Sequence, residues 1–195
     1  MKNRAPKDGK IRCAWARAGG DLMREYHDRE WGAPCHDERR LFEFILLEGA
    51  QAGLNWATVL NKRENYRRAF AGFDPRKIAR FSPAKTAALL NDSGIIRNRL
   101  KIESAVINAK CFLQTAEEFG GFDSYLWRFT GGAPLQGKPP APATSPQGDA
   151  FAKDMKRRGF KFFGSTIAYA YMQAVGMVND HDRQCFRRAE CAALR

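Results

Sequence analysis

Residues 41–56 read LFEFILLEGAQAGLNW, an apolar run long enough for a helix that nevertheless carries two acids. Glu43 can lie on the solvent-facing side of such a helix, whereas apolar side chains surround Glu48. A carboxylate in apolar surroundings needs partners, and without them its pKa rises. Two glycines remove side-chain bulk beside Glu48, and Trp56 adds an aromatic ring. The stretch therefore predicts a buried helix that borders a pocket for a flat ligand.

Most of the remaining chain has helical spacing, so we expect an all-α fold. The sequence shows no alternating strand pattern and no internal repeat. Asp74-Pro75 and Ser82-Pro83 each resemble an N-cap followed by a proline in the first turn of a short helix. Residues 131–148 form a proline-rich surface loop, and Gly176 ends the last helix. The longer helices are expected at residues 38–50, 55–70, 99–118, 124–129, 149–158 and 165–175.

The length of 195 residues fits one domain with two helical lobes, which we place at residues 11–186. Residues 1–10 form a basic, mobile N-terminal tail, and residues 187–195 form a basic C-terminal tail. The first residues lack the apolar stretch of a signal peptide, and no apolar run approaches the length of a membrane span. The odd number of cysteines, five, favours a reducing compartment, so we expect a cytoplasmic protein.

The formal charge of +12 favours a polyanionic partner. Nucleic acid is the first choice, an anionic membrane surface is the second, and a basic protein without such a partner is the third. Three basic clusters strengthen the preference for nucleic acid, at residues 62–68, 97–101 and 156–161.

A glycine turn at Gly94 joins two of the expected helices. If the following helix opens there, the amides of Gly94 and Ile96 can bind a phosphate group, because helix N-termini carry free N–H groups. Arg97, Arg99 and Lys101 can add charge-assisted contacts. The alternative is an ordinary helix–helix turn with a glycine cap.

Metal-binding side chains occur near both ends of the chain. His181 and Cys185 are four residues apart, so they share one face if that segment is helical. With Cys13 and His27 they offer two nitrogens and two sulfurs, the donor set of a structural zinc site. From spacing alone, the rival ligands Cys35-His36 and Cys191 remain open, as does a purely structural role for all of these side chains.

Four aromatic residues lie in the same parts of the sequence. Tyr26 directly precedes His27, so a metal site there would hold its ring in place. Trp15, Tyr26 and Trp56 can sandwich a flat ligand or fill the core, and we assign Trp31 to the core.

Several motifs occur in order between residues 11 and 186. They are Cys13-Ala14-Trp15, YHDREWG at 26–32, LEGAQAGLNW at 47–56, KRENY at 62–66, GIIR at 94–97, KRRGFKF at 156–162 and NDHDRQC at 179–185. Together they resemble the DNA-3-methyladenine glycosylase I family, of the helix-hairpin-helix DNA glycosylase superfamily. Mild departures from the family pattern are Asn55, where serine is common, and Ser165, where threonine is common.

The resemblance implies a helix-hairpin-helix glycosylase fold in which one structural Zn²⁺ ties the two ends of the chain together. Its ligands would be Cys13, His27, His181 and Cys185. The resemblance also implies that Tyr26, Glu48 and Trp56 line the pocket for the excised base, beside Trp15. Leu54 would fill the gap that the flipped nucleotide leaves in the duplex.

The activity that follows is hydrolytic excision of 3-methyladenine from alkylated double-stranded DNA, which leaves an abasic site. We expect a monomer without lyase activity, without an obligate protein partner and without membrane attachment. An alkylated base is already a good leaving group, so Glu48 serves to orient the base rather than to protonate it. Two rivals remain: a non-catalytic, zinc-stapled helix-hairpin-helix module that binds damaged DNA, and a nuclease or lyase that nicks the strand.

Overall fold

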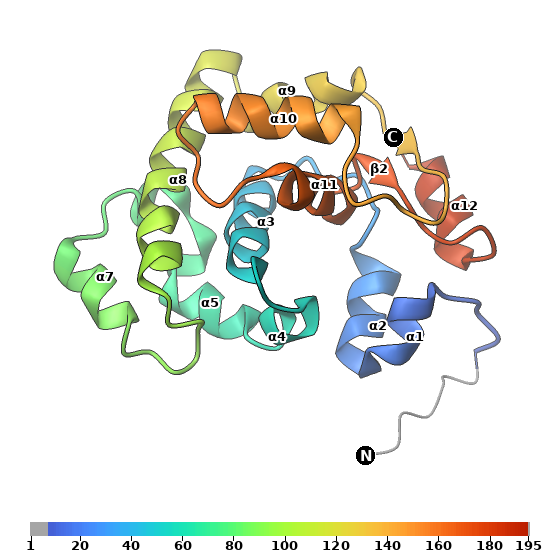
Figure 1. The fold of residues 1–195 in the computed structure, drawn as a ribbon, viewed down its shortest axis with the longest axis horizontal. Coiled ribbons are helices and arrows are strands. Elements are labelled where there is room, and N and C mark those ends of the chain that lie inside the picture. Colours follow the sequence, from blue (N-terminus) through green and yellow to red (C-terminus); the bar gives the residue numbers. More distant parts are fainter. Residues whose placement is uncertain (1–7, 195) are drawn as a thin grey trace.

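The computed structural model describes residues 8–194 and is mostly helical (Figure 1). The expected helical class is therefore confirmed, with one addition. Two short strands, β1 (Leu135–Gln136) and β2 (Val178–Asn179), pair in parallel. The helices are α1 (Ala14–Ala18), α2 (Gly20–Arg29), α3 (Glu38–Gln51), α4 (Trp56–Leu60), α5 (Arg63–Ala69), α6 (Pro75–Ile78), α7 (Pro83–Leu89), α8 (Arg99–Phe119), α9 (Phe122–Trp127), α10 (Pro146–Arg157), α11 (Ser165–Ala174) and α12 (Phe186–Ala193), with 3₁₀ turns η1 (Ala71–Phe73) and η2 (Arg128–Thr130).

Helix α3 lies in the middle of the molecule (Figure 1). Its residues 41–50 are all buried, including Glu43 and Glu48. A helix that is apolar on every side must be surrounded, and α8, α9 and α11 pack around it. The side chain of Asp37 starts α3 by accepting a hydrogen bond from the amide of Arg40 at 2.8 Å. The stretch quoted first therefore forms the central helix.

The caps expected at Asp74 and Ser82 are confirmed, because each side chain accepts hydrogen bonds from the amides that open α6 and α7. The single helix expected over residues 55–70 is wrong, since α4 and α5 are separate. The amide group of Asn61 donates back to the carbonyl of Ala57 at 2.7 Å, where α4 ends. Such local bonds compete with the backbone ladder and can end a helix.

Helix α8 begins at Arg99, as the sequence predicts, and Asn98 caps it. The turn before it differs from the expectation, because the amides of Gly94 and Ile96 do not open this helix. The amide of Gly94 donates to Asp92 Oδ1 at 2.7 Å, and the amide of Ile96 donates to the Tyr66 hydroxyl at 3.3 Å. Both amides therefore already bond within the protein.

The C-terminal residues form structure that the sequence did not indicate. His181 and Cys185 do not share a helix; they lie in a turn that Cys185 closes by donating its amide to the Asp182 carbonyl at 2.9 Å. The expected basic tail at 187–195 is wrong over most of its length, because α12 packs the side chain of Cys191 into the protein. The N-terminal tail lies largely outside the described residues. Within residues 8–194, no helix is long and apolar enough to cross a membrane.

Candidate active site and metal centre

Four metal-binding side chains meet between the two ends of the described chain. Cys13, His27, His181 and Cys185 are all buried, and their ligand atoms lie within 4.8 Å of one another. Cys185 Sγ is 3.3 Å from His27 Nε2 and 3.5 Å from His181 Nδ1. Cys13 Sγ is also 3.5 Å from His181 Nδ1. The structure thus brings together the predicted set, which could hold one metal ion.

The surroundings of this cluster orient the ligands. The second ring nitrogen of His27 lies 2.8 Å from Asp28 Oδ1, and that of His181 lies 3.0 Å from the Trp31 carbonyl. Acceptors on the far nitrogens fix the tautomer that leaves the near nitrogens free to bind a metal. The same contacts are therefore those expected behind metal-bound histidines.

The two thiols compete for a proton when no cation is considered. The contact with Cys185 raises the pKa of the Cys13 thiol, and the contact with Cys13 lowers the pKa of the Cys185 thiol. One thiolate therefore disfavours the other. A bound cation would allow both to ionise, which is the state that binds metal.

The rival ligands lie outside the cluster. His36 is half exposed and pairs with Asp123, with Nδ1 and Oδ1 2.9 Å apart. Cys35 is buried in the apolar core. Cys191 Sγ lies 3.7 Å from His181 Nε2, which is the nitrogen turned away from the other ligands.

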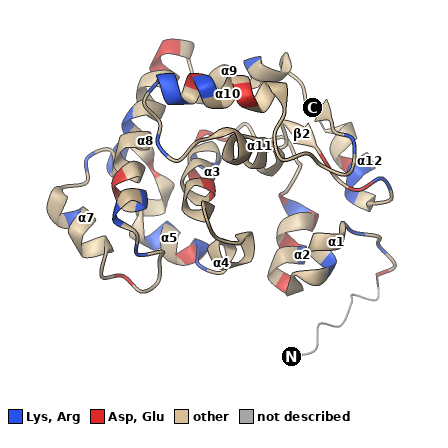
Figure 2. Ribbon diagram, in the orientation of Figure 1, with Lys and Arg blue, Asp and Glu red and all other residues tan. Residues whose placement is uncertain are grey.

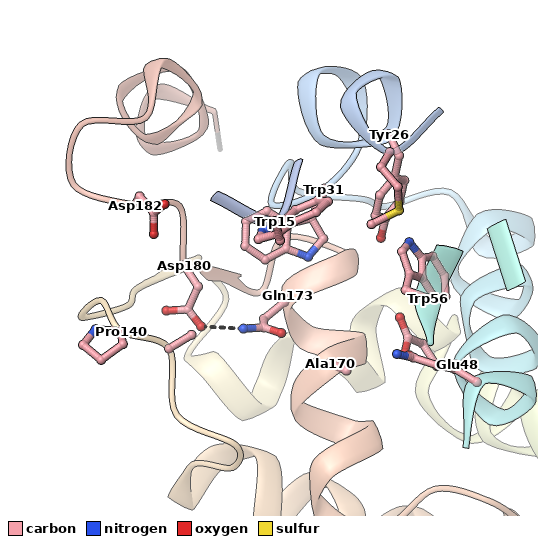
Figure 3. Close-up of a pocket in the computed structure, with 13 residues that line it drawn as sticks. Trp15, Tyr26, Trp31, Glu48, Trp56, Pro140, Ala170, Gln173, Asp180 and Asp182 are labelled. Atoms are coloured by element: carbon pink, nitrogen blue, oxygen red, sulfur yellow. Dashed lines mark hydrogen bonds between the residues drawn. The ribbon is translucent and has the colours of Figure 1, made fainter. Parts of the chain in front are cut away.

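A cavity of about 410 Å³ lies between α2, α3, α4 and α11 (Figure 3). The structure places four predicted pocket residues in its wall, namely Trp15, Tyr26, Glu48 and Trp56. Leu54 does not line the cavity. Its side chain is 43% exposed in the turn between α3 and α4.

Glu48 has unusual surroundings for an acid. Its side chain is 3% exposed, and Oε2 has no hydrogen-bond partner within residues 8–194. Burial raises the pKa of Glu48 from 4.5 to about 8, because the charged form loses its hydration. The carboxyl therefore carries a proton at neutral pH until a donor or a positive charge enters the cavity.

Aromatic rings face this acid. The rings of Tyr26 and Trp56 are 5.3 Å apart with an interplanar angle of 45°, and those of Trp15 and Tyr26 are 6.4 Å apart. Trp31, which we had assigned to the core, also lines the cavity and packs edge-on against Trp15 at 5.1 Å. The cavity therefore combines ring faces with one poorly solvated carboxyl group, which suits a flat ligand that has donors or a positive charge.

Four polar cavity residues were missed from the sequence, namely Gln51, Gln173, Asp180 and Asp182. Asp180 had a signal, since it directly precedes His181, a candidate metal ligand, within the NDHDRQC motif at residues 179–185. Gln173 had none, because it reaches the cavity only through the packing of α11 beside α3.

The residues predicted to contact the DNA backbone separate into two groups. Arg97 and Arg99 are exposed, and basic residues also lie on α5, α8 and α10 (Figure 2). Lys101 instead donates to the carbonyls of Ala50 at 2.8 Å and Ala52 at 2.6 Å, at the end of α3. The Lys101 ammonium is thus engaged in fixing the helix that carries Glu48.

Comparisons with known proteins identify the family of this chain. Residues 15–188 match the family model described as methyladenine glycosylase. The DNA-3-methyladenine glycosylase 1 of Escherichia coli (strain K12) is 44% identical over 178 residues, which cover 89% of this chain and 95% of that protein. A crystal structure of 3-methyladenine DNA glycosylase I superposes with a TM-score of 0.86 at 46% identity, covering 90% of this chain and 98% of the other. The enzyme from Staphylococcus aureus gives a TM-score of 0.87 at 30% identity, covering 91% and 96%. The chain belongs to the methyladenine glycosylase family.

Proposed function

We propose that this protein hydrolytically excises 3-methyladenine from alkylated double-stranded DNA. The observation that carries the proposal is the buried carboxyl of Glu48, whose Oε2 has no partner within residues 8–194, beside the rings of Tyr26 and Trp56. The named relatives are DNA-3-methyladenine glycosylases, and the Staphylococcus aureus structure addresses recognition of 3-methyladenine. The product is an abasic site.

The chemistry needs little acid catalysis. Alkylation at N3 gives the base a positive charge, which weakens the glycosidic bond and lets the base leave as a neutral molecule. The enzyme must extrude the nucleotide, at a cost of a few kcal/mol, and hold the base. Stacking of the cationic base on Trp56 contributes about 0.5–2 kcal/mol.

Glu48 then acts as a recognition group. A cation in the cavity favours the ionised carboxylate, so Glu48 loses its proton as the base enters and accepts a hydrogen bond from the exocyclic amine. Tyr26 packs against Trp56 and closes the cavity on the α2 side. Water completes the cleavage at the sugar. No lysine lines the cavity within the described residues, which supports an enzyme that does not form a Schiff base or nick the strand.

Contacts with the duplex belong to the exposed elements near the cavity. Leu54 stands beside Gly53 at the turn after α3 and is our candidate to fill the gap in the duplex. We assign the α7–α8 turn to a helix-hairpin-helix element, in which Arg97 and Arg99 contact the phosphates. For the amides of Gly94 and Ile96 to bind a phosphate as well, they would have to give up their hydrogen bonds within the protein. Lys101 would likewise have to give up its hydrogen bonds to backbone carbonyls.

The metal proposed for the Cys/His cluster is one structural Zn²⁺. Tetrahedral zinc with Zn–S of about 2.3 Å and Zn–N of about 2.0 Å separates sulfur and nitrogen ligands by about 3.5 Å. The observed separations of 3.3 to 3.5 Å fit this value. Four protein ligands leave no open position, so the ion would tie α1 and α2 to the C-terminal segment and take no part in the reaction.

One assay tests the activity against both rivals. The protein is incubated with methylated duplex DNA, and free base is measured together with strand breaks before alkali treatment. We expect free 3-methyladenine without strand breaks. Free base with breaks would indicate a lyase, and neither product would indicate a non-catalytic DNA-binding module.

Matched variants connect the activity to the cavity. Glu48→Ala and Trp56→Ala should lose most of the base release while their metal content and folded structure remain. Glu117→Ala, an exposed acid on α8, is the control and should excise at the parental rate. Parental rates in the Glu48 and Trp56 variants would refute the assignment of the pocket.

A further inference from the structure

The cavity has a second polar wall on the side opposite Glu48 (Figure 3). Gln173 on α11 and Asp180, directly after β2, form this wall. Asp180 is 4% exposed, and its Oδ2 accepts hydrogen bonds from the Tyr169 hydroxyl at 2.6 Å and from Gln173 Nε2 at 2.9 Å. The acid therefore holds the amide group of Gln173 rather than facing the cavity alone.

This contact determines which atom Gln173 presents. A carboxylate oxygen accepts hydrogen bonds, so the amide nitrogen of Gln173 must face Asp180. The amide oxygen then points the other way, into the space in front of Glu48 and Trp56 (Figure 3). Gln173 and the ionised form of Glu48 thus present acceptors to the ligand from opposite walls.

Asp180 is closely packed on its other side. The Oδ1 atom of Asp180 lies so close to Gly137 that a Cβ atom added to this glycine would be only 1.6 Å from it. The carbonyl of Gly137 accepts a hydrogen bond from Arg188 Nη2 at 2.7 Å, and Arg188 Nη1 donates to the His181 carbonyl at 2.6 Å. Arg188 on α12 therefore fixes the loop that confines the acid.

We propose that Gln173, held by Asp180, reads the positive charge of the flipped base and is a specificity-determining residue of the reaction. The inference rests on the proposed function. Normal adenine carries the same exocyclic amine as 3-methyladenine, so contact with Glu48 alone cannot separate them. A cationic purine is attracted to an amide oxygen, whereas neutral adenine turns lone pairs on its ring nitrogens toward it and is repelled.

Two small ligands isolate this effect from catalysis. The 3,9-dimethyladeninium ion is permanently charged and carries a methyl group in place of the sugar, so it cannot be cleaved. Its isostere with carbon in place of N3 has the same shape and no charge. Quenching of the fluorescence of the cavity tryptophans reports the affinity for each ligand, and their ratio measures the preference for charge.

Gln173→Met keeps the length of the side chain and removes the acceptor. We expect the affinity ratio to fall about tenfold, as for loss of a polar contact to a charged group, with little change in binding of the neutral ligand. Gln173→Glu retains acceptor atoms and adds a negative charge, so its ratio should equal or exceed the parental ratio. Gln114→Met, the same substitution on an exposed part of α8, should change nothing.

Metal content and the unfolding midpoint are measured for every variant. If Gln173→Met keeps the parental affinity ratio, the inference is overturned. It is also overturned if this variant loses affinity for both ligands equally, because that result indicates a structural role. An equal fall in ratio for Gln173→Glu would also overturn it. If the unmodified protein binds neither ligand and releases no base from methylated DNA, the proposed function fails instead.

Discussion

The protonation of Glu48 makes a prediction that couples stability to ligand binding. Its pKa is about 8 in the folded protein and near 4.5 when exposed, because burial disfavours the charge. The folded state therefore holds a proton that the unfolded state has released between these two pH values. Stability from this group is complete below pH 4.5 and is lost as the pH rises toward 8. The difference between the two pKa values corresponds to a loss of at most about 5 kcal/mol in the free energy of unfolding.

Glu48→Gln removes this titration and keeps the shape of the side chain. At pH 9 the variant should be more stable than the parent by up to about 5 kcal/mol, whereas at pH 5 the two should be nearly equal. Urea unfolding at both pH values measures the difference. Tyr26 does not interfere, since burial keeps its pKa well above 10. An equal stability difference at both pH values would refute the argument.

Binding should show the opposite dependence on pH. At pH 7 about one folded molecule in ten has an ionised Glu48, and at pH 9 about nine in ten do. The affinity for 3,9-dimethyladeninium should therefore rise about tenfold over this interval and then become constant. Glu48→Gln should bind it weakly and independently of pH. A flat profile for the parent, or a rise that persists in the variant, would show that Glu48 does not meet the cation.

Three further predictions concern the metal, the duplex and the hairpin. Cys185→Ser should reduce the zinc content from about one ion per chain to none and destabilise the fold by several kcal/mol. Elemental analysis measures the zinc content and thermal unfolding measures the stability. A parent protein that is stable without zinc would contradict the proposed site. Leu54→Ala should change stability by less than about 0.5 kcal/mol and slow excision from duplex DNA without weakening free-base binding, as equilibrium unfolding and single-turnover kinetics can show. Arg97→Ala should reduce the slope of log K for DNA binding against log salt concentration by the amount expected for about one phosphate contact. An unchanged slope in salt titrations would exclude that contact.

Local signals in the sequence predicted the helix starts well. Asp74 and Ser82 cap α6 and α7 because a cap depends only on side chains and amides within three residues. The division of α4 from α5 was not visible, since the apolar spacing continues across it and only the back-bonded amide of Asn61 marks the end. Helix α12 was missed because a short, charged helix becomes stable only through packing.

The residues of the candidate site differ in how far the sequence alone could predict them, because long-range packing brings them together. The donor chemistry of Cys13 and His181 pointed to a metal centre, but only the fold brings residues so distant in sequence within 3.5 Å. Gln173 carries no pattern that distinguishes it from a surface glutamine. Its role follows from the neighbour that orients its amide, which no spacing rule predicts.

The metal cluster and the cavity share consecutive residues at two places. Tyr26 precedes His27 on α2, and Asp180 precedes His181 after β2. Tyr26 and Asp180 lie in opposite walls of the cavity, so each wall has a residue next to a histidine of the cluster. The Trp31 carbonyl, which contacts His181 Nε2, fixes a third part of the lining. If the four side chains hold a metal ion, they fix both of these cavity residues to one point. The cluster therefore positions Tyr26 on one wall of the cavity and, on the other, Asp180, which holds the amide group of Gln173.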